Sequence, residues 1–92
     1  GYLRPEERAL APRLFAQLQR TAESVRAGDD LTAIEHDASQ RLASLGFAPD
    51  YVSIRRQEDL AEPGIGDRAL VILVAARLGK ARLIDNLEVV RS

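Results

Sequence analysis

The sequence has no cysteine, no methionine and no tryptophan, and its aromatic residues are two phenylalanines and two tyrosines. Without cysteine, the chain can form neither a disulfide framework nor a thiolate zinc site, and this absence fits a cytoplasmic protein. With so little aromatic bulk, a core must be built from leucine, isoleucine, valine and alanine. A single histidine also excludes a metal centre made of several imidazole ligands.

An excess of one charge and a long hydrophobic run are also missing. The chain has 13 basic and 14 acidic residues, whereas a nucleic-acid surface usually shows a clear basic excess, so we expect no nucleic-acid partner. The longest apolar run is too short to span a bilayer and no signal peptide is visible, so we expect no membrane contact. Ninety-two residues allow one domain, and a start at Gly1 rather than methionine suggests an excised fragment or a processed product.

The most informative stretch is residues 70–86, LVILVAARLGKARLIDN. Its first part, Leu70–Leu78, is aliphatic with one charge, which is typical of a strand buried on both faces. Gly79-Lys80 separates it from a second apolar run, which predicts a β-hairpin with a type II′ turn. We expect Leu70–Leu78 to be the central strand. A two-residue turn sets the register of the hairpin, with Leu78 facing Ala81 and Arg77 facing Arg82.

A helix is expected near the start of the chain. Pro5 suits a first helical position, because its φ is preset and its missing amide would be unpaired anyway. Pro12 removes a backbone hydrogen bond about two turns later, so we predict a kink or a restart near Ala11. Gly28 ends the helix as the residue after the cap.

A second helix and a strand should follow. Asp29 and Asp30 are N-cap candidates, a capping box at 32–35 competes with them, and Gly46 stops the helix. Val52 and Ile54 alternate with polar residues, which predicts a half-buried strand at 51–56. Residues 48–50 are expected to form a turn, residues 57–68 a loop with room for one helical turn at 58–61, and the last strand to fade after residue 87.

These elements predict an α+β domain, with two helices packed on one face of a three-stranded antiparallel sheet in chain order. The inner face, toward the helices, should consist of Leu70, Ile72, Val74, Ala76, Leu83, Asp85 and Leu87. The outer face should consist of Val71, Leu73, Ala75, Arg77, Arg82, Ile84, Asn86 and Glu88. The outer face is too apolar for open solvent yet edged with charge, and such a surface often meets another domain or subunit.

Arg77 and Arg82 are the candidate site residues. Two like charges that face each other across a hairpin are unfavourable unless a negative group lies nearby. One interpretation is therefore an anion site, for a phosphate, a carboxylate or an acidic residue of a partner domain. The simpler interpretation is that both side chains reach solvent or pair with the chain's own acidic residues, because exposed ion pairs are common and weak.

Other polar residues offer no catalytic constellation. His36 points away from the apolar stripe of its helix and is expected on the surface. Asp29 and Asp30 could hold a cation, but helix capping explains both. The glycines at 64 and 66 are not followed by the Lys-Ser/Thr pair of a phosphate-binding loop. No serine has a histidine partner for nucleophilic chemistry.

Three segments resemble one known family in order and without large gaps. LVAARLGKARLIDN looks like the closing segment of pantothenate synthetase, also called pantoate–β-alanine ligase. GYLRPEERALAPRLFAQL resembles the piece after the nucleotide-binding loop of that family, and LGFAPDYVSIRRQEDL matches the middle of the same C-terminal domain. The resemblance covers nearly the whole chain.

The resemblance implies that residues 1–92 are the C-terminal lid domain of a ligase that condenses pantoate with β-alanine through a pantoyl-adenylate. In the family, ATP and Mg²⁺ are bound by an N-terminal Rossmann domain with a HIGH-like motif and a KMSKS-like loop. Neither motif occurs here, so we expect no cofactor on this fragment and no catalytic residue within it. The implied partners are the nucleotide-binding domain and, through the parent enzyme, pantoate, β-alanine and ATP. The implied parent is a cytoplasmic homodimer.

Two other classes of function stay open. The chain could be a non-catalytic protein-interaction or dimerisation module, which should self-associate when isolated. It could also be an RNA-binding domain, against which balanced charge and few aromatics argue.

Overall fold

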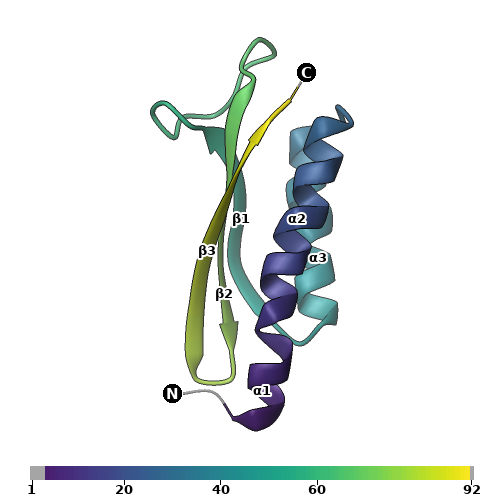
Figure 1. Cartoon of the computed structure of the whole chain (residues 1–92), viewed down its shortest axis with the longest axis vertical. Coiled ribbons are helices and arrows are strands. Elements are labelled where there is room, and N and C mark those ends of the chain that lie inside the picture. Colours follow the sequence, from purple (N-terminus) through teal and green to yellow (C-terminus); the bar gives the residue numbers. More distant parts are fainter. Residues whose placement is uncertain (1–3, 92) are drawn as a thin grey trace.

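The computed structural model describes residues 4–91 and has two layers, one helical and one a β-sheet (Figure 1). Within that range the elements are α1 (Pro5–Leu10), α2 (Pro12–Arg26), α3 (Leu31–Ser44), β1 (Ala48–Arg56), β2 (Ala69–Leu78) and β3 (Ala81–Val90). Helices α2 and α3 lie side by side on one face of the antiparallel sheet, whose strand order is β1-β2-β3. The predicted α+β fold and its strand order are confirmed. None of the described helices has the length and hydropathy needed to cross a bilayer.

The helix boundaries follow the local signals of the sequence. Pro12 divides the first predicted helix into α1 and α2 at Ala11, as expected from its missing amide. Helix α2 ends in a Schellman motif at Gly28, which has φ +86°. Asp30 caps α3 through a 3.0 Å bond from the Ala33 amide. The competing capping box does not form, because α3 begins at Leu31 and Thr32 therefore lies inside the helix.

Gly46 and Phe47 close α3 and join it to the sheet. Gly46 has φ +105°, and the Phe47 amide donates to the Leu42 carbonyl at 3.0 Å, which completes a second Schellman motif. The Phe47 side chain is buried in the core together with Leu42. The helix end therefore fixes where the chain enters β1.

The hairpin register is confirmed, with Leu78 opposite Ala81 and Arg77 opposite Arg82. Gly79 has φ +60°, whereas Lys80 does not have a positive φ, which is the pattern of a type II′ turn. Strand β3 continues to Val90, so the prediction that it fades after residue 87 was too short.

The prediction of a turn at residues 48–50 is wrong, because β1 already begins at Ala48. Pairing with β2 shifts between Pro49 and Tyr51, so Asp50 is an additional residue on β1 with no partner opposite it. Such a β-bulge lets a polar sequence with a proline belong to a strand, because the ladder is locally interrupted.

One core lies between the layers. Its buried residues come from every long element: Leu14, Leu18, Ala22, Val25, Ile34, Leu42, Phe47, Ile54, Leu70, Ile72, Val74, Ala76, Leu78 and Val89. All buried side-chain nitrogen and oxygen atoms of the described residues have a hydrogen-bond partner. The packing therefore satisfies the polar groups that it takes from water.

The loop of residues 57–68 is held by side chains rather than by a helix. Arg91 donates to the carbonyls of Gly64 and Asp67, both at 2.7 Å, and Gln57 donates to the Leu70 carbonyl at 2.9 Å. Arg56 contacts the acidic residues of the same loop, and its pKa is raised chiefly by its hydrogen bond to Glu58. The expected helical turn at 58–61 is absent, and the loop begins with a turn at 57–59.

Candidate functional site

The outer face of the sheet is left uncovered by the helices, which pack on the opposite face. The strand register arranges its side chains in rows: Tyr51, Ala75 and Ile84; then Ser53, Leu73 and Asn86; then Arg55, Val71 and Glu88. Ala75 and Val71 are buried in the middle strand, while Tyr51 and Ile84 beside them are 41% and 66% exposed. The predicted division into an inner and an outer face is confirmed.

Arg77 and Arg82 lie opposite each other at the turn end of this face, next to the row of Tyr51 and Ile84. A carboxylate of the chain itself lies between them. Arg82 Nε donates to Asp50 Oδ2 at 2.9 Å, and Arg77 Nε lies 3.7 Å from Asp50 Oδ1. The repulsion expected between the two arginines is therefore offset by one internal acid, and their role toward an external anion stays a prediction.

The electrostatics of Asp50 follow from these contacts. The hydrogen bond from Arg82 is the main reason why the pKa of Asp50 is lowered from its ordinary value of 3.8, and the charge of Arg77 adds to it. Partial desolvation opposes this shift. Asp50 is therefore ionised at neutral pH, and with the two arginines it leaves a local charge of +1.

Sequence reasoning missed Asp50 because it was assigned to a turn. Arg82 lies 32 residues later in the chain, so no local pattern links the two. The only sequence signal is an acid just before the alternating strand, on the side where the hairpin ends. The β1–β2 register brings it to the arginines.

The other polar candidates have structural explanations. His36 is exposed on α3, as expected. Asp30 is the α3 cap, so capping accounts for one of the two adjacent acids. Residues 4–91 contain no group of three or more histidine or acidic side chains that could hold a metal ion.

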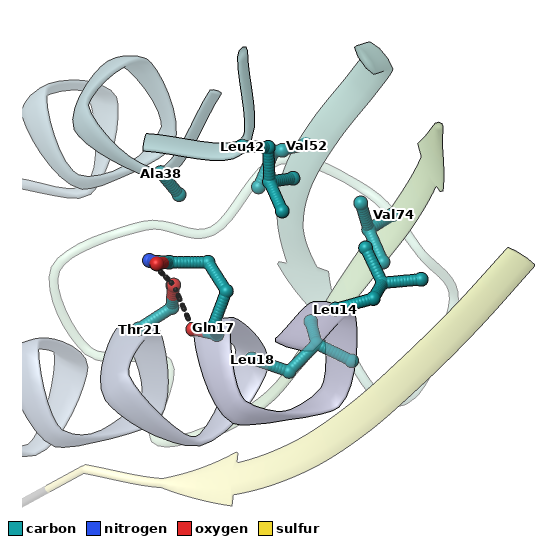
Figure 2. A pocket seen from close by; sticks show the side chains of 8 residues that line it. All are labelled: Leu14, Gln17, Leu18, Thr21, Ala38, Leu42, Val52 and Val74. Carbon is teal, nitrogen blue, oxygen red and sulfur yellow. Dashed lines mark hydrogen bonds between the residues drawn. The ribbon is translucent and has the colours of Figure 1, made fainter. Parts of the chain in front are cut away.

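Side chains from α2, α3 and the sheet line the space between the two layers (Figure 2). Gln17 and Thr21 are buried there, and each satisfies the other: Gln17 Nε2 donates to Thr21 Oγ1 at 3.3 Å, and that hydroxyl donates to the Gln17 carbonyl at 2.8 Å. The remaining gap is too small for a water molecule. This polar pair is part of the core and does not form a ligand site.

Open clefts occur at other places on the described surface. One of about 230 Å³ lies beside the hairpin turn and is lined by Arg4, Glu7, Gly79 and Lys80. One of about 330 Å³ lies between the α2–α3 connection and the 57–68 loop. The first cleft has no hydroxyl or thiol side chain, and in the second the side chains of Asp30 and Arg91 are engaged in the hydrogen bonds that cap α3 and hold the loop.

Comparison with known proteins gives the family. The family model for pantoate-beta-alanine ligase matches residues 1–88. Pantothenate synthetase of Nitrosococcus oceani is 54% identical over 90 residues, covering 97% of this chain and 32% of that protein. The Methylococcus capsulatus enzyme is 56% identical over 87 residues, covering 94% and 30%. A crystal structure of pantothenate synthetase from Thermus thermophilus superposes with a TM-score of 0.80 at 32% identity, over 94% of this chain and 32% of that one.

The chain therefore belongs to the pantoate–β-alanine ligase family, and the resemblance found in its sequence is confirmed. It spans about a third of the length of the relatives that it matches.

Proposed function

We propose that residues 1–92 are the C-terminal lid domain of an ATP-dependent ligase that joins pantoate to β-alanine through a pantoyl-adenylate. The proposal rests on family membership and on the share of the relatives that this chain covers, about a third. The remaining two thirds would contain the nucleotide-binding domain. We assign ATP and Mg²⁺ to that domain, because this sequence has no phosphate-binding loop.

The observation that carries the lid role is the outer face of the sheet. Tyr51 and Ile84 leave apolar surface exposed beside Arg77 and Arg82, and aromatic residues and arginine are enriched where protein surfaces bind each other. We infer that this face closes against the nucleotide-binding domain. Closure would exclude water from a reactive adenylate and complete the site.

The position of α1 supports the same arrangement. Helix α1 and the β2–β3 turn lie at the same end of the molecule (Figure 1), and a Cβ atom at Gly79 would collide with the Glu7 carboxylate. A domain that precedes α1 in the parent polypeptide would thus adjoin the turn and the two arginines. Within this proposal, Arg77 and Arg82 contact either an anionic ligand or an acidic residue of that domain.

The proposal also covers the setting of the parent enzyme. We expect a cytoplasmic homodimer whose substrates are pantoate, β-alanine and ATP, with no nucleic acid and no membrane as partner. This chain would supply a covering surface, and its own residues would perform no chemical step.

Pantoate-dependent ATP–pyrophosphate exchange tests whether the chemistry belongs to the nucleotide-binding domain and not to this chain. The isolated chain should show no exchange above a buffer control, because it lacks every adenylate-forming motif, whereas the full-length polypeptide should be active. The matched control is the full-length protein with Val74→Asp. This change disrupts only this domain, so the variant tests whether activity depends on a folded lid. Exchange by the pure isolated chain would contradict the proposal.

A non-catalytic interaction or dimerisation module is the alternative, and the same exposed face favours it. A dimer formed by pairing of sheet edges is disfavoured, because on each edge strand a carboxylate accepts a hydrogen bond from a backbone amide. Glu35 accepts from the Ile54 amide of β1 at 2.7 Å, and Asp85 accepts from the Asn86 amide of β3 at 2.8 Å. A dimer of the isolated chain in sedimentation, lost on Ile84→Asp, would favour this alternative.

A further inference from the structure

Asp50 contacts both arginines of the outer face through the same kind of atom. One carboxylate oxygen faces Nε of Arg82 and the other faces Nε of Arg77. Each guanidinium has five donors in a planar fork, and a contact through Nε leaves the end-on N–H groups of the two terminal nitrogens unused. Among residues 4–91, the side-chain hydrogen bond of this pair is the one from Arg82 Nε to Asp50, and none comes from a terminal nitrogen of either arginine. Asp50 is thus hydrogen-bonded to Arg82 and ion-paired with Arg77, and the terminal nitrogens of both arginines stay available to a partner.

We propose that Asp50 is a positioning residue that aligns Arg77 and Arg82 so that their terminal nitrogens bind one carboxylate of the nucleotide-binding domain when the lid closes. This inference rests on the proposed lid function. It adds the residue that orients the pair and the chemical class of the group that the pair receives. Without Asp50, two guanidiniums that face each other across the hairpin would repel and turn apart.

The backbone explains why Asp50 can do this. It is the unpaired residue of the bulge between Pro49 and Tyr51, and bulges commonly re-aim a side chain at the rim of a sheet. Pairs on both sides of the bulge hold its backbone in the sheet, so the carboxylate starts from a fixed point. By contrast, Arg55 at the other end of the outer face meets Glu62 of a loop in a single 3.3 Å contact, and that acid is almost fully exposed.

A protein carboxylate fits the surroundings better than a small anion. Small-molecule sites are usually concave, and the described clefts near the turn and the 57–68 loop are lined by other residues. The surface beside the arginines is instead a row with exposed Tyr51 and Ile84, which a protein surface can cover. About two thirds of each relative lies outside the matched region and can supply that surface. The local charge of +1 is complementary to a negative partner.

The first experiment follows arginine side chains in the isolated chain by NMR. In the native chain, the Nε–H signals of Arg82 and Arg77 should be resolved and protected from exchange with water. Asp50→Asn should collapse both signals toward the free-arginine position, and Asp50→Glu should keep at least the Arg82 signal shifted. Glu62→Gln, which removes the comparable pair at Arg55, should leave both signals unchanged. Unchanged Arg82 and Arg77 signals in Asp50→Asn would overturn the positioning role.

The second experiment measures the full-length polypeptide. Asp50→Asn should lower kcat/KM about five- to tenfold, as expected for a weakened charge-assisted contact, with Glu62→Gln unchanged and Asp50→Glu partly restored. If Arg77→Gln with Arg82→Gln lowers kcat/KM but Asp50→Asn does not, the positioning role is wrong and the lid proposal stands. If neither change has an effect, the outer face is not the closing surface and both fail.

The third experiment separates a domain carboxylate from a small anion. Inorganic phosphate and pyrophosphate are titrated into the isolated chain, with the Arg77 and Arg82 Nε–H signals as the readout. Absence of saturable shifts at millimolar concentration supports the domain carboxylate. Saturable binding that disappears in Arg77→Gln with Arg82→Gln would overturn it in favour of a phosphate-bearing ligand.

Discussion

The inner and outer faces of the sheet come from the same three strands, but their surroundings are opposite. On the inner face, the side chains of β2 are completely buried under α2 and α3. On the outer face, β2 is almost as apolar, and Val71 and Ala75 are buried merely by their cross-strand neighbours, while Tyr51 and Ile84 at the flanks stay exposed. Burial on the inner face accounts for folding, whereas the exposed apolar side chains at the flanks of the outer face contribute less to it. Under the proposed lid function, the comparison separates stability from binding along one strand.

Adjacent residues of β2 give the largest expected difference between the faces. Val74 is 1% exposed on the inner face, so Val74→Asp buries an unpaired carboxylate at a cost of several kcal/mol, comparable to the whole stability of a small domain. Leu73 is half-buried on the outer face, where an aspartate can reach water. Circular dichroism and thermal melting should show Val74→Asp unfolded and Leu73→Asp folded with a lower Tm. Equal unfolding of both would mean that the outer face is as essential to the fold as the core.

Substitution of one isoleucine on each face extends the comparison without adding a charge. Ile72 is fully buried on the inner face, and Ile72→Ala should cost about 2–5 kcal/mol through lost contacts and a cavity. Ile84→Ala on the outer face removes the same atoms from a largely exposed side chain and should change the free energy of unfolding by about 0.5 kcal/mol or less. Urea unfolding at constant m measures both. A large loss in Ile84→Ala would show that the outer row stabilises the isolated domain.

The hairpin and its two faces could be predicted because their signals are local. Gly79 supplies the positive φ of the turn, and the period of two along β2 then decides which side chains face the helices. Gly46 and Phe47 are likewise a local signal for the end of α3, because the motif that closes the helix lies in these two residues. The resemblance to the ligase family could also be found from the sequence, because it lies in continuous segments of the chain.

The organisation of the site could not be predicted, because its contacts join residues that are distant in the chain. Asp50 meets Arg82 only after the β1–β2 register and its bulge are formed. Glu35 was a candidate for a competing capping box, but it accepts from an edge amide of β1, 19 residues away. Arg91 organises a loop 24 to 27 residues before it. Each of these partners depends on tertiary structure, for which a local pattern gives no signal.

The two arginines of the outer face should matter for activity and little for stability. Replacing both Arg77 and Arg82 with glutamine should shift the Tm of the isolated chain by about 4 °C or less, since exposed ion pairs contribute little. In the full-length enzyme the same change should raise KM for ATP or lower kcat, because closure loses a charge-assisted contact of roughly 1.5–3 kcal/mol. Arg55→Gln, at the other end of the same face, is the control. Unchanged kinetics of the double variant would mean that the pair is only a solvated hairpin end.

The smallest expected effect is a change in the titration of Asp50. Because Arg82 and Arg77 lower its pKa in the folded state below 3.8, this carboxylate stabilises the fold at pH values above 3.8, and its contribution disappears as the pH falls through the lower folded-state pKa. Carbon-detected NMR of the Asp50 carboxyl should give a midpoint below 3.8 in the native chain. Arg82→Gln should raise the midpoint most, because it removes the hydrogen bond, Arg77→Gln should raise it less, and Arg55→Gln should not change it. The same midpoint in the native chain and in Arg82→Gln would show that the contact is not maintained in solution, and the outer face would then lack the organised charge that distinguishes it from the inner one.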